Sequence, residues 1–166
     1  MRERGHVINA VCLGVGTGVL LDPSMTVGTL RSVLGVGVPV VLGALLPDVD
    51  TSFGAHRVHG HNLLVLGAVL AFPLIYGNLG WVWLGVVTHY VLDLLGNVRG
   101  MALFYPLTRR FYDVPVGVTV NSPLADVVTV IVTGVELAVI AAIVRAGEAG
   151  ILADPSQIID VVGSLA

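Results

Sequence analysis

Five apolar stretches, separated by short breaks that contain proline, glycine or charged residues, dominate the chain. Each approaches the roughly 20 apolar residues that a helix needs to cross a bilayer. We expect spanning helices over residues 6–21, 27–46, 62–76, 81–95 and 124–145. Pro47 marks the end of the second stretch, and Gly77–Gly80 forms a tight turn between the third and the fourth. The pattern predicts an all-α, polytopic membrane bundle of about five helices.

The chain between the fourth and fifth stretches has a different character. Residues 96–123 are richer in Arg, Pro, Tyr and Asn and too irregular to span. Irregular backbone is tolerated at membrane depth only where protein covers it, so we expect an interfacial or re-entrant segment here. The tail ILADPSQIIDVVGSLA is typical of a short amphipathic surface helix. With no repeat or linker in view, we expect residues 1–166 to form a single integral membrane domain.

Composition agrees with a membrane location. Hydrophobic residues make up 55% of the chain and charged residues 11%, against roughly 25% charged in soluble proteins, and the mean hydropathy is +0.94. The net charge of −3 argues against direct nucleic-acid binding, which requires basic patches. The chain is therefore expected to bury its helices in lipid.

Alternation of the predicted helices gathers the polar side chains at one end of the bundle. The first helix leaves the side that carries His6, the second returns to it, the third departs again, and the fourth comes back. All five histidines and three aspartates then share this side: His6, Asp48, Asp50, His56, His59, His61, His89 and Asp93.

The distribution of arginines orients this end. Six arginines lie on the histidine side, and only Arg31 and Arg145 lie opposite; the six are Arg2, Arg4, Arg57, Arg99, Arg109 and Arg110. The positive-inside bias then places the histidine side in the cytoplasm. Aromatic residues around the opposite turn agree with this orientation, because aromatic belts mark membrane interfaces.

In THYVLDLL, His89 and Asp93 are four residues apart and lie on one helix face. The pair can hold a metal together, or the carboxylate can orient the imidazole. A helix-stabilising contact is the alternative for an isolated pair, but ionisable groups inside a span are functional by default. PDVD adds Asp48 and Asp50 directly after a helix stop; alone, it would read as an ordinary polar loop.

HRVHGH adds three imidazoles, His56, His59 and His61, which converge if Asn62 begins a helix. A solvated loop or a pH-sensing cluster is the alternative. The eight groups exceed the three or four ligands of one zinc. Either two ions are bound close together, or some of the groups orient the ligands or act as an acid or base. Arg57 and Arg99 have the two-point geometry that grips phosphate or carboxylate.

We therefore assign metal binding to the carboxylates and imidazoles, acid–base chemistry to Asp50 and His59, and substrate binding to Arg57 and Arg99. The expected metal ligands are His6, Asp48, Asp50, His56, His61, His89 and Asp93. Zinc suits this mixed set best, with manganese or magnesium as alternatives and one or two ions bound.

Two further features concern helix packing. Glu136, near the middle of the last span, should face the bundle and hydrogen-bond Thr88 or another helix. Glycines of the first two spans, including Gly14, Gly35 and Gly37, predict close helix contacts.

These motifs, in this order, resemble the YdjM-like family of membrane-bound, predicted metal-dependent hydrolases, also described as LexA-binding inner-membrane proteins. The family pattern is an early His, L-P-D-x-D, H-R-G-x-T-H-S, s-H-x-x-x-D and a G…P-x-x-R segment. The chain shows His6, LLPDVD, HRVHGHNL, THYVLD and GMALFYPLTRR over about residues 1–112. It departs from the pattern at Val58, Gly60 and Asn62, and His59 is additional. The resemblance implies a metal site on the polar residues above, with Arg57 beside it; a more distant similarity to zinc-dependent phospholipases C implies a phosphoester substrate.

The favoured function is a metal-dependent hydrolase of the inner or plasma membrane, in which metal-activated water attacks a phosphoester or another lipid-linked ester at the cytoplasmic face. A non-catalytic membrane protein, with a structural or sensing metal site that binds a partner, is the alternative. A small metal-ion transporter comes third. The oligomeric state is left open.

Overall fold

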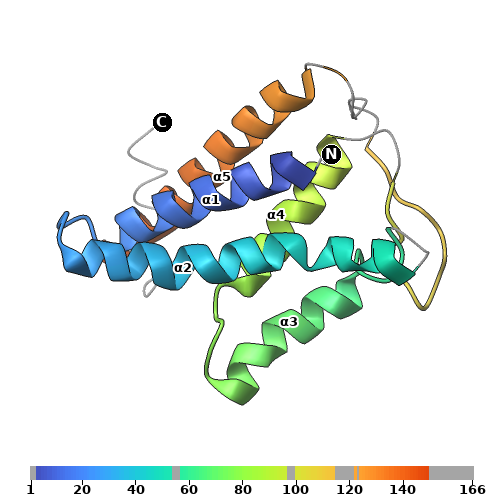
Figure 1. Cartoon of the computed structure of the whole chain (residues 1–166), viewed down its shortest axis with the longest axis horizontal. Helices are drawn as coiled ribbons and strands as arrows, with labels where there is room; N and C mark the ends of the chain where they lie inside the picture. Colours follow the sequence, from blue (N-terminus) through green and yellow to red (C-terminus); the bar gives the residue numbers. More distant parts are fainter. Residues whose placement is uncertain (1–2, 54–56, 97–99, 115–121, 123, 150–166) are drawn as a thin grey trace, which may run out of the picture.

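The computed structural model describes residues 3–53, 57–96, 100–114, 122 and 124–149 (Figure 1). The described part is helical, with no strand beyond an isolated bridge between Met101 and Tyr112. Its elements are α1 (Glu3–Leu21), α2 (Val27–Leu45), the 3-10 helix η1 (Pro47–Phe53), α3 (Leu63–Tyr76), α4 (Val82–Leu95) and α5 (Leu124–Glu148). The predicted all-α bundle of five helices is confirmed. The expected tail helix lies outside the described residues.

Among the described residues, three helices are long and apolar enough to cross a membrane: α1, α2 together with η1 as far as Thr51, and α5. The other two, α3 and α4, are apolar but span only 14 residues each. The irregular segment predicted after α4 is also seen over residues 100–114. It packs on the start of α3, where the amide of Leu63 donates to the carbonyl of Leu103.

Glycines let the helices approach closely at two crossings. Gly14 of α1 lies against Gly37 of α2, where a side chain would overlap backbone atoms. The predicted packing role is thus seen at Gly14, whereas space is open beside Gly35. A second crossing joins α2 to α4, where Gly43 and Gly85 face each other's helix with no room for a Cβ. This second approach brings the polar turn of α4 against the end of α2.

Local signals set the ends of the elements that carry polar residues. Asn62 caps α3: its side-chain oxygen accepts from the amide of Val65, and its amide group donates to the carbonyls of Val58 and His59. A side-chain acceptor at the N-cap satisfies an amide that the helix leaves unpaired. The expectation that Asn62 begins a helix is confirmed, and its cap fixes the preceding loop.

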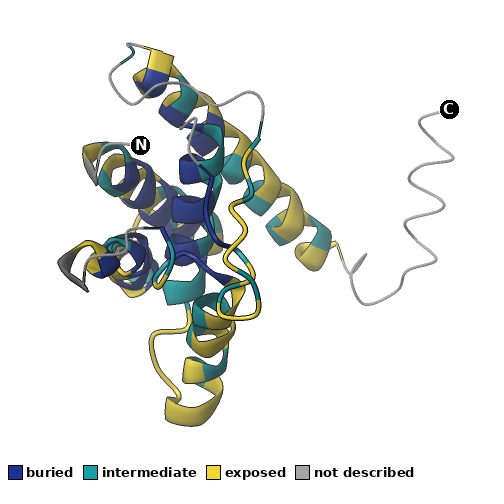
Figure 2. Cartoon of the chain, turned by 90° about the vertical axis from the view of Figure 1, so that its right-hand side faces the viewer, coloured by how far each residue is buried: buried dark blue, intermediate teal, exposed yellow. Residues whose placement is uncertain are grey.

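Burial concentrates where α1, α2 and α4 meet, and in the loop that precedes α3 (Figure 2). By contrast, none of the residues of α3 is buried. The buried set is unusually polar for a bundle of apolar helices: it includes His6, Asn9, His61, His89 and Asp93. Because buried polar groups are costly unless they are paired, these residues mark the part of the bundle that needs a chemical explanation.

Candidate metal centre

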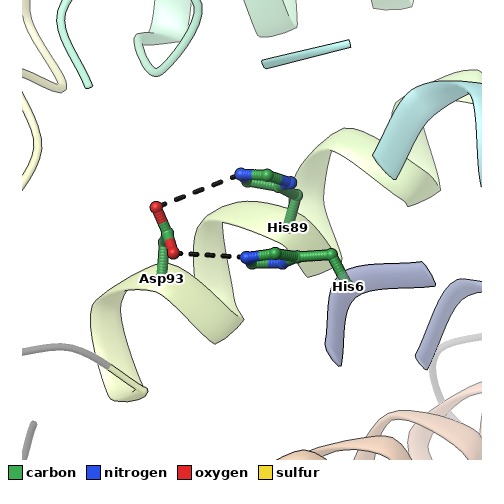
Figure 3. A group of neighbouring side chains, drawn as sticks. All are labelled: His6, His89 and Asp93. Atoms are coloured by element: carbon green, nitrogen blue, oxygen red, sulfur yellow. Dashed lines mark ion pairs between the residues drawn. The ribbon is translucent and has the colours of Figure 1, made fainter. Parts of the chain in front are cut away.

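Residues from four segments converge at the end of the bundle where α2 stops. His6 comes from α1, Asp48 from η1, His61 from the loop before α3, and His89 and Asp93 from α4. Two overlapping groups have ligand atoms within 4.8 Å of one another: His6, His89 and Asp93, and Asp48, His61 and His89. Figure 3 shows His6 and His89 with their rings parallel and Asp93 beside both.

Hydrogen bonds fix the orientation of the two central imidazoles. His89 Nδ1 lies 2.6 Å from the carbonyl oxygen of Ala44, and His61 Nδ1 lies 3.1 Å from Asp50 Oδ2. A carbonyl and a carboxylate can only accept, so each Nδ1 carries the hydrogen and each Nε2 presents a lone pair. Burial lowers the pKa of His61, which keeps this imidazole neutral at neutral pH.

The two lone pairs face each other. His61 Nε2 and His89 Nε2 are 3.1 Å apart. Asp48 Oδ1 lies 3.8 Å from the first and 3.6 Å from the second, and Asp93 Oδ2 lies 3.5 Å and 4.0 Å from them. Ligands about 2.0–2.1 Å from a tetrahedral zinc are separated by about 3.3 Å. The distances from the two nitrogens to each carboxylate oxygen are near this value, so these groups could hold a cation.

His6 lies on the other side of Asp93. Its Nε2 is 3.3 Å from Asp93 Oδ1, and its ring stacks on that of His89 with centroids 3.8 Å apart. The buried Nδ1 of His6 has no hydrogen-bond partner among the described residues. Both candidate groups use His89, whose Nδ1 is engaged with Ala44, so one ion at a time can take its Nε2.

Arg57 supplies the positive charge next to the cluster. Its guanidinium Nη2 lies 2.8 Å from Asp93 Oδ2, and the side chain is buried. The residue has a left-handed backbone, φ 69°, which costs a non-glycine residue about 1–2 kcal/mol. Its amide donates to Asp50 Oδ2 and its carbonyl accepts from Ala102, and both contacts hold that conformation.

The chemistry of the cluster also suits a divalent cation. Among the described residues, the carboxylates of Asp48, Asp50 and Asp93 lie around the imidazole of His61. Carboxylate and imidazole ligands together are accepted by zinc and related divalent ions.

Asp50 lies behind His61, and it belongs to neither candidate group. Its Oδ2 accepts from the amides of Arg57 and Gly60 in addition to facing His61 Nδ1. Through these contacts, the side chain ties the loop before α3 to η1. The geometry thus gives Asp50 the position of a group that orients an imidazole.

His59 is not brought into the cluster. Its side chain is exposed, and its ring stacks on Tyr105 with centroids 5.1 Å apart. The acid–base role expected of His59 stays a prediction. His56 and Arg99, expected as ligand and substrate contact, lie outside the described residues.

Two supporting groups were missed by the sequence reasoning. The carbonyl of Ala44 orients His89, and the hydroxyl of Tyr90 donates to the carbonyls of Gly60 and Asn62. A backbone carbonyl leaves no mark in a sequence, whereas Tyr90 stands directly after His89 in THYVLD. A side chain at Gly60 would overlap the backbone of Pro47, so the close approach of these two segments requires glycine at this position.

A second buried polar group lies next to the cluster, across α1, α4 and α5. Thr88 Oγ1 is 2.7 Å from both Asn9 Oδ1 and Glu136 Oε1. Asn9 Nδ2 donates to Glu136 Oε2 at 2.8 Å and to Thr133 Oγ1 at 2.9 Å. The predicted contact between Glu136 and Thr88 is confirmed.

Comparison with known proteins identifies one family. Neither the curated proteins nor the solved structures contain a match. A family model described as YdjM inner membrane protein matches residues 1–153, which is most of the chain.

Proposed function

This chain belongs to the YdjM inner membrane protein family, and on that premise we propose that it is a divalent-metal-dependent hydrolase embedded in the membrane. Its substrate would be a phosphoester or another lipid-linked ester at the cytoplasmic face. The arginine distribution in the sequence supports that orientation. Zinc fits the mixed imidazole and carboxylate set best, with manganese or magnesium as alternatives.

One observation carries the proposal: two imidazoles, each held by an acceptor at Nδ1, point their Nε2 lone pairs at each other across 3.1 Å. Two lone pairs repel at that distance unless a positive charge lies between or beside them. Carboxylate oxygens of Asp48 and Asp93 lie within 4.0 Å of both nitrogens. We infer a single ion held by Asp48, His61, His89 and Asp93.

Each residue then has a distinct task. Asp50 and the Ala44 carbonyl hold the rings of His61 and His89, and His6 and Arg57 hold the two oxygens of Asp93. A bound divalent ion supplies a water-derived nucleophile at neutral pH and polarises the scissile bond.

Asp48 marks the side from which a substrate would approach. Its side chain is 27% exposed, whereas those of His61, His89 and Asp93 are at most 2% exposed. Arg57 sits against Asp93, so it offsets charge at the ion rather than reaching outward.

Elemental analysis together with a turnover assay tests the proposal. Purified wild type should contain about one ion per chain and hydrolyse a lipid phosphoester. His89→Ala should lose both the ion and the activity. His59→Ala, at an exposed imidazole outside the cluster, is the control for metal content. Equal metal content in wild type and His89→Ala would overturn the proposal.

Metal without turnover would instead support the alternative of a structural or sensing site that binds a partner. The ion pair between Arg57 and Asp93 favours that alternative, because it occupies a carboxylate oxygen with a fixed cation. If His89→Ala lost the activity but kept the metal content of wild type, both readings would be contradicted.

A further inference from the structure

An apolar cavity of about 490 Å³ lies between α2 and α3. All of its lining side chains are aliphatic or aromatic. Its size lies within the ~300–1,000 Å³ usual for ligand pockets. Such pockets normally include a few polar groups that fix a ligand's orientation, and here the lining offers none. A hydrocarbon chain is the ligand chemistry that such a lining accepts.

Six of the eight lining residues lie on single faces of α3 and of α2 with its C-cap, and Leu79 and Val82 complete the wall. Val65, Ala68, Val69 and Phe72 of α3 follow the spacing of one helix face, and Leu42 and Leu46 of α2 lie one turn apart. In Figure 1, α3 begins beside the end of α2 and diverges from it toward the α3–α4 turn. The cavity thus extends along the bundle, away from the polar end.

One end of the cavity adjoins the metal centre. Leu46 is the C-cap of α2 and precedes Asp48 by two residues, so their Cα atoms are at most about 7.6 Å apart. On the facing wall, the amide of Val65 is bonded by Asn62, the residue after His61. Asp48 is also the half-buried member of the centre, on the side where a substrate would approach.

We propose that this cavity, here called the α2–α3 groove, holds the hydrocarbon chain of a phosphoester lipid whose phosphate lies at the metal centre. The inference rests on the proposed function. An amphiphile in a bilayer places its ester at the interface and its chain toward the middle, which matches the order of centre and groove. An apolar groove beside the centre favours a lipid substrate over a soluble ester.

A photoreactive alkyl phosphate with a diazirine at the end of its chain tests the groove directly. The metal-loaded full chain should be labelled on the lining residues of α2 and α3. Ala68→Trp should reduce this labelling about tenfold, since a chain that loses a few methylene contacts in an apolar pocket loses that much or more. Leu70→Trp is the matched control, because Leu70 is exposed on another face of α3.

Three outcomes would overturn the inference. Labelling spread over the exposed apolar faces of α5 would show bulk lipid contact, and labelling unchanged in Ala68→Trp would exclude a chain in the groove. A long alkanol that competes as well as the alkyl phosphate would separate the groove from the centre and overturn the inference too.

Turnover of 4-nitrophenyl alkyl phosphates separates the two proposals. With a short alkyl group, Ala68→Trp should match wild type in metal content and in kcat/KM. With a long alkyl group, its kcat/KM should fall about tenfold. Labelling without turnover would support the groove and overturn the hydrolase. If kcat/KM depended neither on the length of the alkyl chain nor on Ala68→Trp, the hydrolase would be supported and the groove overturned.

Discussion

At the scale of single residues, the centre depends on which nitrogen of each imidazole carries the hydrogen. Asp50 makes that choice for His61, and the same oxygen also accepts two amides from the loop before α3. A carboxylate behind a ligating imidazole raises its basicity and fixes its ring. Asp50 would thereby act on a bound ion without belonging to either ligand group.

Replacing this carboxylate by an amide should weaken metal binding without unfolding the loop. In Asp50→Asn the side-chain oxygen can still accept the amides of Arg57 and Gly60, but the negative charge behind His61 is lost. We expect zinc affinity, measured by competition with a chelating dye, to fall about 10–100-fold. An affinity equal to that of wild type would remove the orienting role, and His61→Ala should bind more weakly still.

The residues of the centre were predictable from the sequence because they lie in short motifs at helix ends. Helical spacing pairs His89 with Asp93, and alternation brings both to the end that carries Asp48. The division of labour was not predictable. Whether Asp50 faces an ion or an imidazole depends on the 3-10 turn of η1, and whether His59 points inward depends on the cap at Asn62.

At the scale of elements, α1, α4 and α5 are joined by the network around Glu136. Thr88 has one hydrogen to donate, yet its oxygen lies 2.7 Å from two oxygens, Asn9 Oδ1 and Glu136 Oε1. Thr133 donates to the carbonyl of Thr129, so it can only accept from Asn9. Every contact is satisfied once Glu136 is a neutral acid that donates to Thr88. The carboxyl group then adds no charge to the bundle.

These hydrogen bonds predict that the protein tolerates Glu136→Gln but not Glu136→Ala. Glutamine can donate to Thr88 with its amide group and accept from Asn9 with its oxygen. Alanine leaves one amide hydrogen of Asn9 buried without its acceptor and removes the donor to Thr88. We expect Glu136→Ala to lose about 1–3 kcal/mol of unfolding free energy, and Glu136→Gln to lose less than about 0.5 kcal/mol. Denaturant unfolding in detergent measures both. A Glu136→Gln variant as unstable as Glu136→Ala would show that the carboxylate is charged.

The helices themselves followed from apolar length, but their closest contacts did not. Gly43 and Gly85 set the crossing of α2 and α4 that brings His89 to Ala44, and in the sequence they look like any other glycine of an apolar run. Which glycine faces a neighbour depends on the rotation of each helix about its axis. That rotation is fixed by contacts with the neighbouring helices. It cannot be read from the apolar sequence of one helix alone.

At the scale of the whole molecule, the centre joins four segments that lie far apart in the sequence or on different helices. Its groups come from α1, η1, the loop before α3, and α4, while α3 contributes no buried residue of its own. Apolar helices in lipid gain little from hydrophobic burial against one another. An ion shared by four segments would therefore contribute a large part of what fixes the polar end of the bundle.

Removal of the metal should then destabilise the whole chain rather than the site alone. A ligand that binds only the folded state stabilises it by about 2.7 kcal/mol at a free concentration 100 times its Kd. We expect EDTA to lower the thermal unfolding temperature of the purified protein, and added zinc to restore it. His89→Ala should unfold at one temperature under both conditions, whereas His59→Ala should respond as wild type does. A metal-containing wild type whose unfolding temperature ignored EDTA would mean that the ion is bound at the surface, because an ion that holds four segments together cannot leave without loosening them.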